Sequence, residues 1–507
     1  MLNDEIRARG QAALAALSLA ALISCASTMA SAALVISDKP TQNVTCAQGT
    51  CRATHAAAVL NATDLANLLL AGDIVVLADE TPKDIEIATH FSWASAHTLT
   101  LDAFESVAVN KTVTVKEKSG LNLTFNDGST EGALLFAANG RIEFEDTRSS
   151  LLVNSKSYKL LKNIHQLSKV IARNPSGNFA FVGNYDAAGD GTYAAAPIAT
   201  TFSGNFEGLG NRISNLSIDA PADFANVGLF AHVATSGMVR DILLSGGSIR
   251  ARGMQAAAGS LVGENDGTVY DVRSTANVSA DQAWALGGLV GASVNGIIAN
   301  SNSEGAITGN GSVKSGGLLG QSTGGRIMNS RATGSVNANG PWVGGLVGDG
   351  VMGIYSSYAT GDVSGGDNAI VGGLVGGFEP STATSFNTYA TGAVSGGNNS
   401  TVGGLAGMSS APISSAYSTG HVSGGSGSVV GGSIGKVFGS GFSHIYWDTQ
   451  TSGTDQATGL GPCCTITGLT TAEFKAALPS GFDPNIWREH APINGGYPYL
   501  IALPPPH

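Results

Sequence analysis

Short apolar stretches alternate with clusters of glycine, serine and asparagine along most of this chain. The clearest stretch reads GGLVG or a close variant, and its leucine recurs every 28 to 32 residues. Repeats of this length indicate that each copy is one structural unit that stacks on the next. The marker leucines are Leu261, Leu289, Leu318, Leu346, Leu374 and Leu405, with Leu229 in a worn earlier copy and Ser433 in the last copy.

Two further columns of equivalent positions follow each marker. A polar or aromatic residue such as Arg331 or Tyr358 comes 12 to 15 residues after the leucine, and an aliphatic residue such as Val336 or Val363 follows five residues later. Strands must stay in register with the neighbouring copy, whereas an outward loop need not. The length drift between the first two columns therefore predicts stacked strands joined by a variable loop.

The glycine doublets in every copy decide between helix and strand. An interior glycine costs a helix about 1 kcal/mol, so a helical repeat is excluded. Blades of a β-propeller need about 40 residues, which is longer than this repeat. We therefore expect an all-β fold, a right-handed parallel β-helix (β-solenoid) with about 28 residues per coil, built from three short strands and three turns, with short helical caps or insertions. The marker leucines are predicted to form a ladder in its core.

The repeated strings GGLVG, YATGDVSGG and YATGAVSGG resemble the GLUG motif of bacterial secreted and surface proteins over residues 225–448. Ser433 replaces the marker leucine, Ser260 replaces a motif glycine, and Arg or Asn stands in place of Tyr in the first copies. Upstream, short strings between residues 91 and 124 resemble haemagglutinin-type adhesin repeats. The resemblance implies more parallel β-helix there and a role in surface adhesion or extracellular interaction.

The remaining segments complete the predicted organisation. Helices are expected at residues 62–71, 163–173 and 470–478. The C-terminal aromatic residues, Trp487 among them, are predicted to cover the final turn of the solenoid; a sugar-binding platform is the alternative. The predicted parts are a signal peptide (1–32), an N-terminal segment with a disulfide and a capping helix (33–85), a haemagglutinin-like section (86–160), a helical insertion and lead-in (161–224), the GLUG solenoid (225–448) and a C-terminal cap (449–507).

The N-terminus predicts export. Two arginines precede an apolar run at residues 12–23, and small residues favour cleavage after Ala32. Cys25 lies in a lipoprotein-like box, which leaves an outer-membrane lipoprotein as an alternative. Cys46 and Cys51 are the candidate disulfide expected of an oxidising destination. Cys463 and Cys464 could form a vicinal disulfide, pair with another chain or stay free.

The composition and net charge exclude some classes of binding partner. Glycine accounts for 70 of the 507 residues, charged residues for 12%, and the formal net charge is −11. A negative chain repels phosphate backbones and anionic lipid, so we expect no nucleic-acid partner. We expect no integral membrane span after residue 32, and export through separate secretion machinery.

Candidate chemistry is sparse. The GxSxG string at residues 431–435 is the last repeat copy with Ser433 in the leucine column, not a hydrolase elbow. Asp349, Asp362 and Asp367 are read as turn residues, and Asp186 and Asp190 lack a full calcium loop. We assign no catalytic residue, cofactor or metal, including zinc.

The sequence thus predicts a non-catalytic, adhesin-like protein at the cell surface or outside the cell, with the periplasm as an alternative location. Repeated Ser, Thr, Asn and Tyr positions are expected to bind host or matrix glycans or proteins through many weak contacts. A carbohydrate-active β-helix enzyme and a structural matrix component remain the alternatives.

Overall fold

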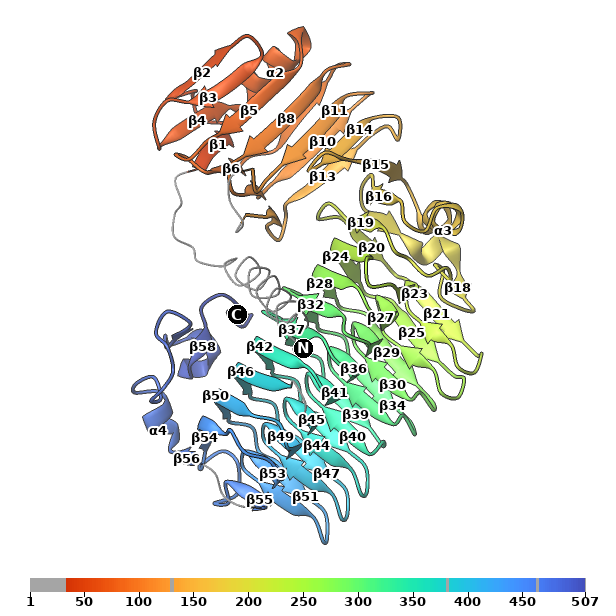
Figure 1. The fold of residues 1–507 in the computed structure, drawn as a ribbon, viewed down its shortest axis with the longest axis vertical. Helices are drawn as coiled ribbons and strands as arrows, with labels where there is room; N and C mark the ends of the chain where they lie inside the picture. Colours follow the sequence, from red (N-terminus) through yellow and green to blue (C-terminus); the bar gives the residue numbers. More distant parts are fainter. Residues whose placement is uncertain (1–32, 128–131, 380–382, 462–464, 507) are drawn as a thin grey trace, which may run out of the picture. The chain divides into compact units, whose positions relative to one another are not determined.

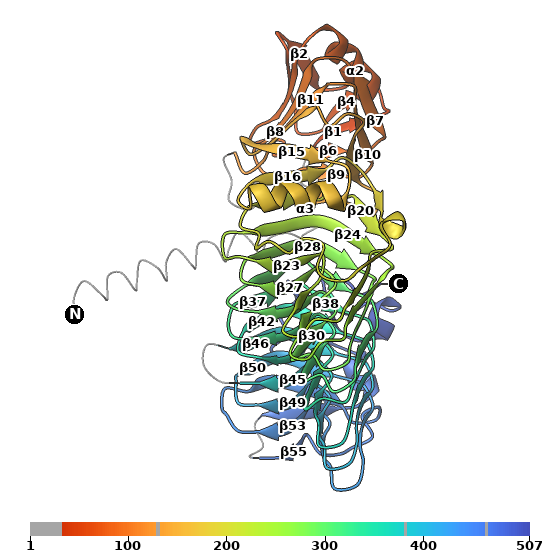
Figure 2. The same ribbon diagram turned by 90° about the vertical axis from the view of Figure 1, so that its right-hand side faces the viewer.

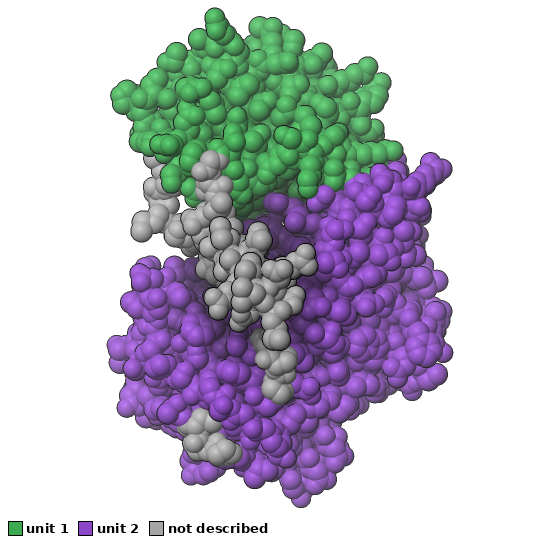
Figure 3. Space-filling model, viewed as in Figure 1, with its two compact units in different colours: residues 1–163, 178–184, 206–211 green, residues 164–177, 185–205, 212–507 purple. Residues whose placement is uncertain are grey.

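The computed structural model describes residues 33–127, 132–379, 383–461 and 465–506. These residues form two compact units (Figure 3). Unit 1 contains the described residues up to Asn163 with 178–184 and 206–211, and unit 2 contains 164–177, 185–205 and the residues from Arg212 onward. The predicted signal peptide, its cleavage site after Ala32, Cys25, Cys463 and Cys464 lie outside the described residues.

Unit 1 is a solenoid with three strands per turn. One turn contains β6 (Asp84–Ile87), β7 (Phe91–Ala94) and β8 (Thr98–Ala103), and the next contains β9 (Val107–Val109), β10 (Thr112–Lys116) and β11 (Gly120–Thr124). Each strand pairs in parallel with its counterpart in the next turn. Successive side chains of a strand point to opposite faces, so Leu99 and Leu101 are buried while Thr98 and Thr100 are partly exposed.

The first turns of unit 1 begin directly at the start of the described chain. β1 (Ala33–Ser37) pairs in parallel with β4 (Ala58–Asn61) and β6. Helix α2 (Ala62–Ala71) begins where the Asn61 side chain accepts hydrogen bonds from the Thr63 and Asp64 amides. Its Leu65 and Leu69 are buried in the core of the unit, as expected for a helix that covers the first turns.

Unit 2 is a longer solenoid with four strands per turn (Figure 1). A representative turn contains β42 (Gly353–Ala359), β43 (Val363–Gly365), β44 (Ile370–Gly372) and β45 (Val375–Phe378). Figure 2 shows the same strands stacked turn on turn from a second side. The ladders run from β18 (Thr192–Tyr193) to β51 (Val422–Gly424), from β22 (Asn226–Val227) to β52 (Val429–Gly431), from β23 (Phe230–Val233) to β55 (Thr458–Leu460), and from β20 (Arg212–Ser214) to β56 (Ile466–Leu469).

The sequence predicted three strands per turn, whereas each turn of unit 2 has four. The GGLVG string explains the difference. The string spans two strands, β40 (Trp342–Gly344) and β41 (Val347–Gly350), with a tight corner between them. A Cβ atom on Gly344 would lie 1.9 Å from the Val347 carbonyl oxygen, and one on Gly345 would lie 2.0 Å from the Gly373 carbonyl oxygen. Only glycine allows the two backbones to come so close, so the motif builds a corner rather than one strand.

The stacking itself agrees with the sequence. The Leu346 amide donates to the Leu374 carbonyl across 2.8 Å, and the Val278, Ile307 and Val336 positions pair in register. The prediction of an all-β parallel solenoid with about 28 residues per coil is confirmed. The marker leucines Leu261, Leu289, Leu318, Leu346, Leu374 and Leu405 are each at most 2% exposed.

A column of left-handed residues bends the long strand of each turn in unit 2. Asn300, Asn329 and Asn387 have φ values of 51°, 45° and 56° and lie at equivalent positions. Asparagine tolerates this conformation better than most residues. Buried serines follow the bend: the Ser301 amide donates to Ser330 Oγ across 3.0 Å. The interior therefore contains a polar ladder beside the aliphatic one.

Two further α-helices of the described residues adjoin the strands of unit 2. Helix α3 (Ile164–Arg173) agrees with the expected helix, and the strands of unit 2 already pair from β20, before residue 225. Helix α4 (Thr471–Phe474) begins with a capping box between Thr470 and Glu473 but is shorter than expected. The segment after β56 also contains β57 (Trp487–Arg488) and β58 (Tyr499–Leu500). It lies beside β46 (Thr384–Ala390), β50 (Ile413–Ser418) and β54 (Ser443–Asp448).

Candidate functional site

The polar or aromatic column identified in the repeats forms one outward ladder of unit 2. The register aligns Arg273, Asn302, Arg331, Tyr358, Tyr389, Tyr417 and Tyr446 on successive turns. The rings of Tyr358 and Tyr389 stack with centroids 4.5 Å apart, and those of Tyr389 and Tyr417 with centroids 5.1 Å apart. We call Tyr358, Tyr389, Tyr417 and Tyr446 the tyrosine column.

The C-terminal segment covers the tyrosine column. Tyr417 donates to the Pro498 carbonyl across 2.5 Å, and Tyr446 donates to the Ser480 carbonyl across 2.8 Å. Trp487 lies against both Tyr389 and Tyr417, with ring centroids 6.0 Å from each, and is fully buried. Because the segment lies along the side of several turns, its rings cover Tyr446 near the end of the solenoid and also earlier turns that the sequence did not predict to be covered.

This burial also corrects the expected presentation of tyrosines. Tyr358, Tyr389 and Tyr417 are each 0% exposed, so they cannot contact a ligand in this arrangement. Burial raises the pKa of the Tyr389 and Tyr417 hydroxyls well above its usual value, which keeps both hydroxyls neutral. The alternative of an aromatic sugar-binding platform needs an exposed Trp487, but this ring is packed inside the same buried cluster.

The Asp448 carboxylate anchors the C-terminal segment at two points, one near its start and one near its end. Tyr497 donates to Asp448 Oδ2 across 2.7 Å, and Thr471 donates to the same oxygen across 2.6 Å. Although burial opposes ionisation, these hydrogen bonds lower the pKa of Asp448 below its ordinary value. Burial and the neighbouring Asp448 raise the pKa of Tyr497 to about 12. The pair therefore stays as a carboxylate and a neutral phenol.

Two of the three earlier positions of the column, Arg273 and Arg331, carry charge. Arg273 forms two contacts with Glu304, of 2.7 and 2.8 Å, and its side chain is 49% exposed. Arg331 lies at the boundary between the open and the covered positions of the column, since its Nη1 donates to the Pro504 carbonyl across 3.1 Å. The change from arginine to tyrosine in the repeats thus coincides with the place where the C-terminal segment begins to cover the column.

A second outward column stays open to solvent. It runs along the later part of one ladder, from β29 (Asn277–Ala280) to β51, and contains hydroxyl and amide side chains without charge. In the two turns before it, the same register position holds the charged Asp219 and Arg250. Its pairing is parallel and in register on every turn. Thr308, Asn337 and Ser423 are exposed and the other members are partly exposed. This polar column consists of Ser279, Thr308, Asn337, Ser364, Ser395 and Ser423.

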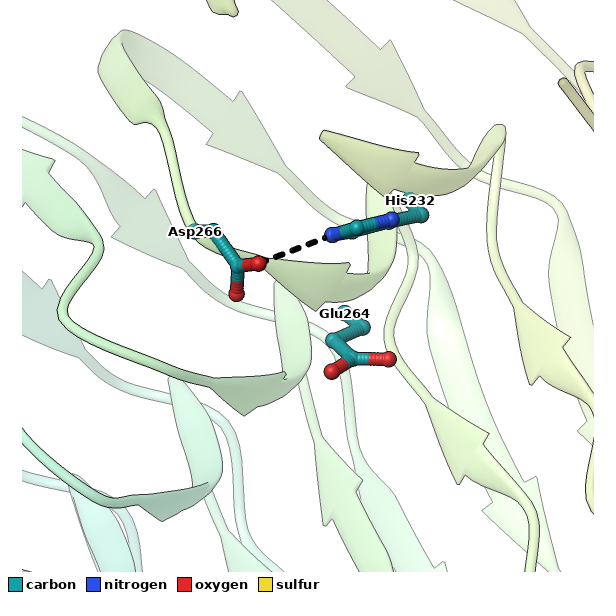
Figure 4. Close-up of side chains that lie close together, drawn as sticks. All are labelled: His232, Glu264 and Asp266. Carbon is teal, nitrogen blue, oxygen red and sulfur yellow. Dashed lines mark hydrogen bonds and ion pairs between the residues drawn. The ribbon is translucent and has the colours of Figure 1, made fainter. Parts of the chain in front are cut away.

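A cluster of potential metal ligands lies where the described strands of unit 2 begin to repeat (Figure 4). His232 on β23 pairs with Glu264 on β27 (Val262–Asn265), and Asp266 follows β27 directly. One ligand atom of each residue lies within 4.8 Å of the others. His232 Nε2 is 3.0 Å from Asp266 Oδ2. No metal was expected from the sequence and this group was not predicted, although His232 and Glu264 each follow their repeat leucine, Leu229 or Leu261, by three residues.

The acidic residues considered for catalysis do not come together. Asp349 is buried in β41 and pairs with Lys314 across 2.8 Å, so its reading as a turn residue is wrong. Asp362 and Asp367 accept hydrogen bonds from the Ala393 and Asn398 amides of the next turn. These hydrogen bonds link successive turns of the solenoid.

The other candidates of the sequence analysis are structural as well. Ser433 is fully buried in the leucine column. Asp190 accepts hydrogen bonds from Tyr185 and Tyr193, and Asp186 accepts from the Ala188 amide and from Asn215. Burial and Asp190 raise the pKa of both tyrosines above the usual range.

Cys46 and Cys51 are joined by a disulfide with Cα atoms 4.0 Å apart. They face each other in the antiparallel hairpin of β2 (Val44–Ala47) and β3 (Thr50–Ala53). The bridge closes the hairpin at the start of unit 1.

Two aspartates, the buried Asp241 and the partly buried Asp271, replace the asparagines of the left-handed column in the early turns. Asp241 and Asp271 have φ values of 57° and 49° and lie at the register position that Asn300 occupies in a later turn. Asp241 is 1% exposed and pairs with Arg240. Burial, together with the charge of Asp241, raises the pKa of Asp271 to about 8. Their burial fits a structural position rather than an open acid–base pair.

The repeats match a known family model. The GLUG motif matches residues 282–308 and 311–337, within the predicted array. This chain carries GLUG motifs. The motif corresponds to whole turns of unit 2, from the strand before the glycine corner to the aliphatic column. The haemagglutinin-like character of residues 86–160 stays a prediction.

Two known proteins resemble parts of the GLUG-bearing chain. Halomucin from Haloquadratum walsbyi (strain DSM 16790 / HBSQ001) is 32% identical over 209 residues, which are 39% of this chain and 2% of halomucin. A crystal structure of a proposed immunoglobulin A1 protease from Bacteroides ovatus shares 17% identity with a TM-score of 0.36, over 68% of this chain and 92% of that chain. Within the described part of the chain, no helix is long and apolar enough to cross a membrane.

Proposed function

We propose that this chain is an exported, non-catalytic adhesin-like protein whose polar column binds glycans or proteins through many weak contacts. The polar column carries the proposal, because it presents one hydroxyl or amide on each of six consecutive turns. Neighbouring turns of a β-solenoid repeat at about 4.8 Å, so the column is a regular row of hydrogen-bonding groups. Repeated weak contacts along such a row add up to useful avidity.

The chemistry of the column favours uncharged ligands rich in hydroxyl groups. Its six side chains carry no charge, and hydroxyl and amide groups both donate and accept hydrogen bonds. Sugar hydroxyls have the same dual character. Partial identity to halomucin supports a location at the cell surface or outside the cell, and the oxidised Cys46–Cys51 pair suits such a destination.

Charge placed in the column tests this proposal. Asn337→Glu and Ser395→Glu each add a carboxylate beside the proposed ligand, and Thr323→Glu adds one at an exposed loop position as the matched control. We expect each column variant to weaken binding on a glycan array or to matrix proteins by about tenfold, the scale of one lost hydrogen bond plus an unfavourable charge. The Thr323→Glu variant should bind like the wild type.

The alternatives give different results in the same experiment. Sugar released from polysaccharides would overturn the non-catalytic assignment in favour of a carbohydrate-active enzyme. A chain that binds no glycan and no protein would support a structural matrix component instead. Cell fractionation adds an independent check, because a strictly periplasmic chain would contradict surface adhesion.

A further inference from the structure

We infer that His232, Glu264 and Asp266 form a site for one divalent first-row transition-metal ion, for which Zn²⁺ is the probe. The three residues lie on two consecutive turns, and their ligand atoms are within 4.8 Å of one another. The 3.0 Å separation of His232 Nε2 and Asp266 Oδ2 is close to the spacing of adjacent ligands around an ion with bonds of about 2.0 to 2.2 Å.

Charge and unmet hydrogen bonding both point to a cation. Glu264 and Asp266 are two residues apart along an extended strand end, so the two carboxylates share one side. Two neighbouring carboxylates repel each other unless positive charge lies between them. Asp266 Oδ1 is buried and has no hydrogen-bond partner among the described residues. A cation at this place would offset the repulsion between the two carboxylates and would bind the unpartnered Asp266 Oδ1.

The surrounding residues orient the three ligands. His232 Nδ1 lies 3.3 Å from Thr201 Oγ1, which leaves Nε2 on the side of the carboxylates. Asn226 Nδ2 donates to Glu264 Oε2 across 2.8 Å, which leaves Oε1 for a ligand. Such outer partners fix the histidine ring and the carboxylate in known metal sites. His232 and Asp266 are about a quarter exposed, so an ion can reach them.

The ligand set selects the class of metal. Calcium and magnesium prefer oxygen ligands alone, and soft thiolate ligands are absent from this cluster. One imidazole with two carboxylates suits zinc or a neighbouring first-row ion. Three protein ligands leave room for water in the remaining position. The ion would tie β23 to β27 and so join two turns of the solenoid.

Metal titration of the full chain tests the site. Protein stripped with EDTA is titrated with ZnCl₂ and, separately, with CaCl₂ by calorimetry at neutral pH. The variants are His232→Ala, the nearly isosteric Asp266→Asn, and Thr201→Val. The matched control is His97→Ala, because His97 pairs with only one carboxylate, Asp73, at 3.4 Å. Circular dichroism establishes that each variant is folded.

We expect wild type and His97→Ala to bind the same number of zinc ions, and His232→Ala and Asp266→Asn to lose one zinc equivalent. Thr201→Val should weaken that zinc site by about tenfold while keeping its stoichiometry. Zinc should also raise the melting temperature of the wild type but not of Asp266→Asn. Equal zinc content in wild type and both ligand variants would overturn the site. Calcium binding as strong as zinc binding and unaffected by His232→Ala would do the same.

Discussion

One outward column of unit 2 has two different chemistries along its length. Arg273, Asn302 and Arg331 hold the early positions, and the tyrosine column holds the later ones. The backbone register is the same in both regions. What differs is the cover: the charged positions pair with Glu304, whereas the C-terminal segment buries the tyrosines.

Variation between repeats can therefore mark an interface within the chain. An exposed ion pair such as Arg273 with Glu304 contributes at most about 1 kcal/mol. Each aromatic pair adds about 0.5–1.5 kcal/mol beyond its buried area. The aromatic region is therefore predicted to hold the larger share of the stability that lies outside the solenoid core.

The largest expected effect comes from Trp487→Ala. Trp487 is fully buried, lies 4.6 Å from the Phe482 ring centroid, and donates to Asn387 Oδ1 across 3.1 Å. Truncating a buried tryptophan costs about 3–5 kcal/mol. We expect a loss of that size in chemical denaturation and faster proteolysis of the C-terminal segment. Trp284→Ala, at a partly buried ring, should cost clearly less; equal losses would contradict the special role of Trp487.

Tyr389→Arg places the chemistry of the early turns in the aromatic region. The arginine would be buried between Tyr358 and Tyr417 without a carboxylate partner, which costs about 3 kcal/mol. We expect the C-terminal segment to detach, measured as protease sensitivity. Phe386→Arg on the same strand is the control, because Phe386 is 47% exposed. If both variants keep the segment protected, the tyrosine column does not bind it.

Asp271→Asn tests the early region through pH. The pKa of Asp271 is raised from 3.8 to about 8 by burial and by Asp241. The folded state therefore holds this proton more tightly than the unfolded state, and the stability from it is complete below pH 4 and is lost as the pH rises toward 8. Asparagine removes that loss and suits the left-handed position, as Asn300 shows.

We expect the Asp271→Asn variant to gain about 1–3 kcal/mol at pH 8 and to unfold with a flatter pH dependence than the wild type. Denaturation at several pH values measures both quantities. Asp38→Asn, at an exposed carboxyl, is the control. A variant with the wild-type slope between pH 4 and 8 would show that Asp271 is not the group responsible.

The smallest effect is expected for Arg331→Tyr, which extends the tyrosine column by one turn. The new ring gains a stack on Tyr358 of about 0.5–1.5 kcal/mol, and the lost hydrogen bond to Pro504 costs a similar amount. Denaturation should show a net change within about 1 kcal/mol. A loss above about 2 kcal/mol would mean that the arginine itself is required at this boundary.

The repeat spacing predicted the stacked strands because each turn depends mainly on its neighbours. The leucine marker and the aliphatic column fixed the register without knowledge of distant contacts. The four-strand turn was missed because the GGLVG string looks like one strand, while the approach of Gly344 to the Val347 carbonyl divides it. The left-handed asparagines recur in the sequence as Asn-Ser pairs, but the pattern of strands around them did not set these pairs apart.

Features that depend on distant segments could not be read from the repeat pattern. The cover over the tyrosine column joins Tyr358 to Pro504, which lie 146 residues apart. His232 lies one turn away from Glu264 and Asp266, so no short spacing motif contains all three residues, and only alignment of the copies could have found His232 and Glu264. Sequence thus predicted the scaffold well and the surfaces that it carries less well.

Hydroxyl-radical footprinting of the full chain, read by mass spectrometry, tests most directly that one column is covered and the rest of the same strands is open. Tyr355 and Tyr358 share β42, and Phe386 and Tyr389 share β46, so each strand contains its own control. We expect oxidation of the partly exposed Tyr355 and the exposed Phe386, and protection of Tyr358, Tyr389 and Tyr417. Oxidation of the tyrosine column to the extent of Phe386 would contradict this prediction.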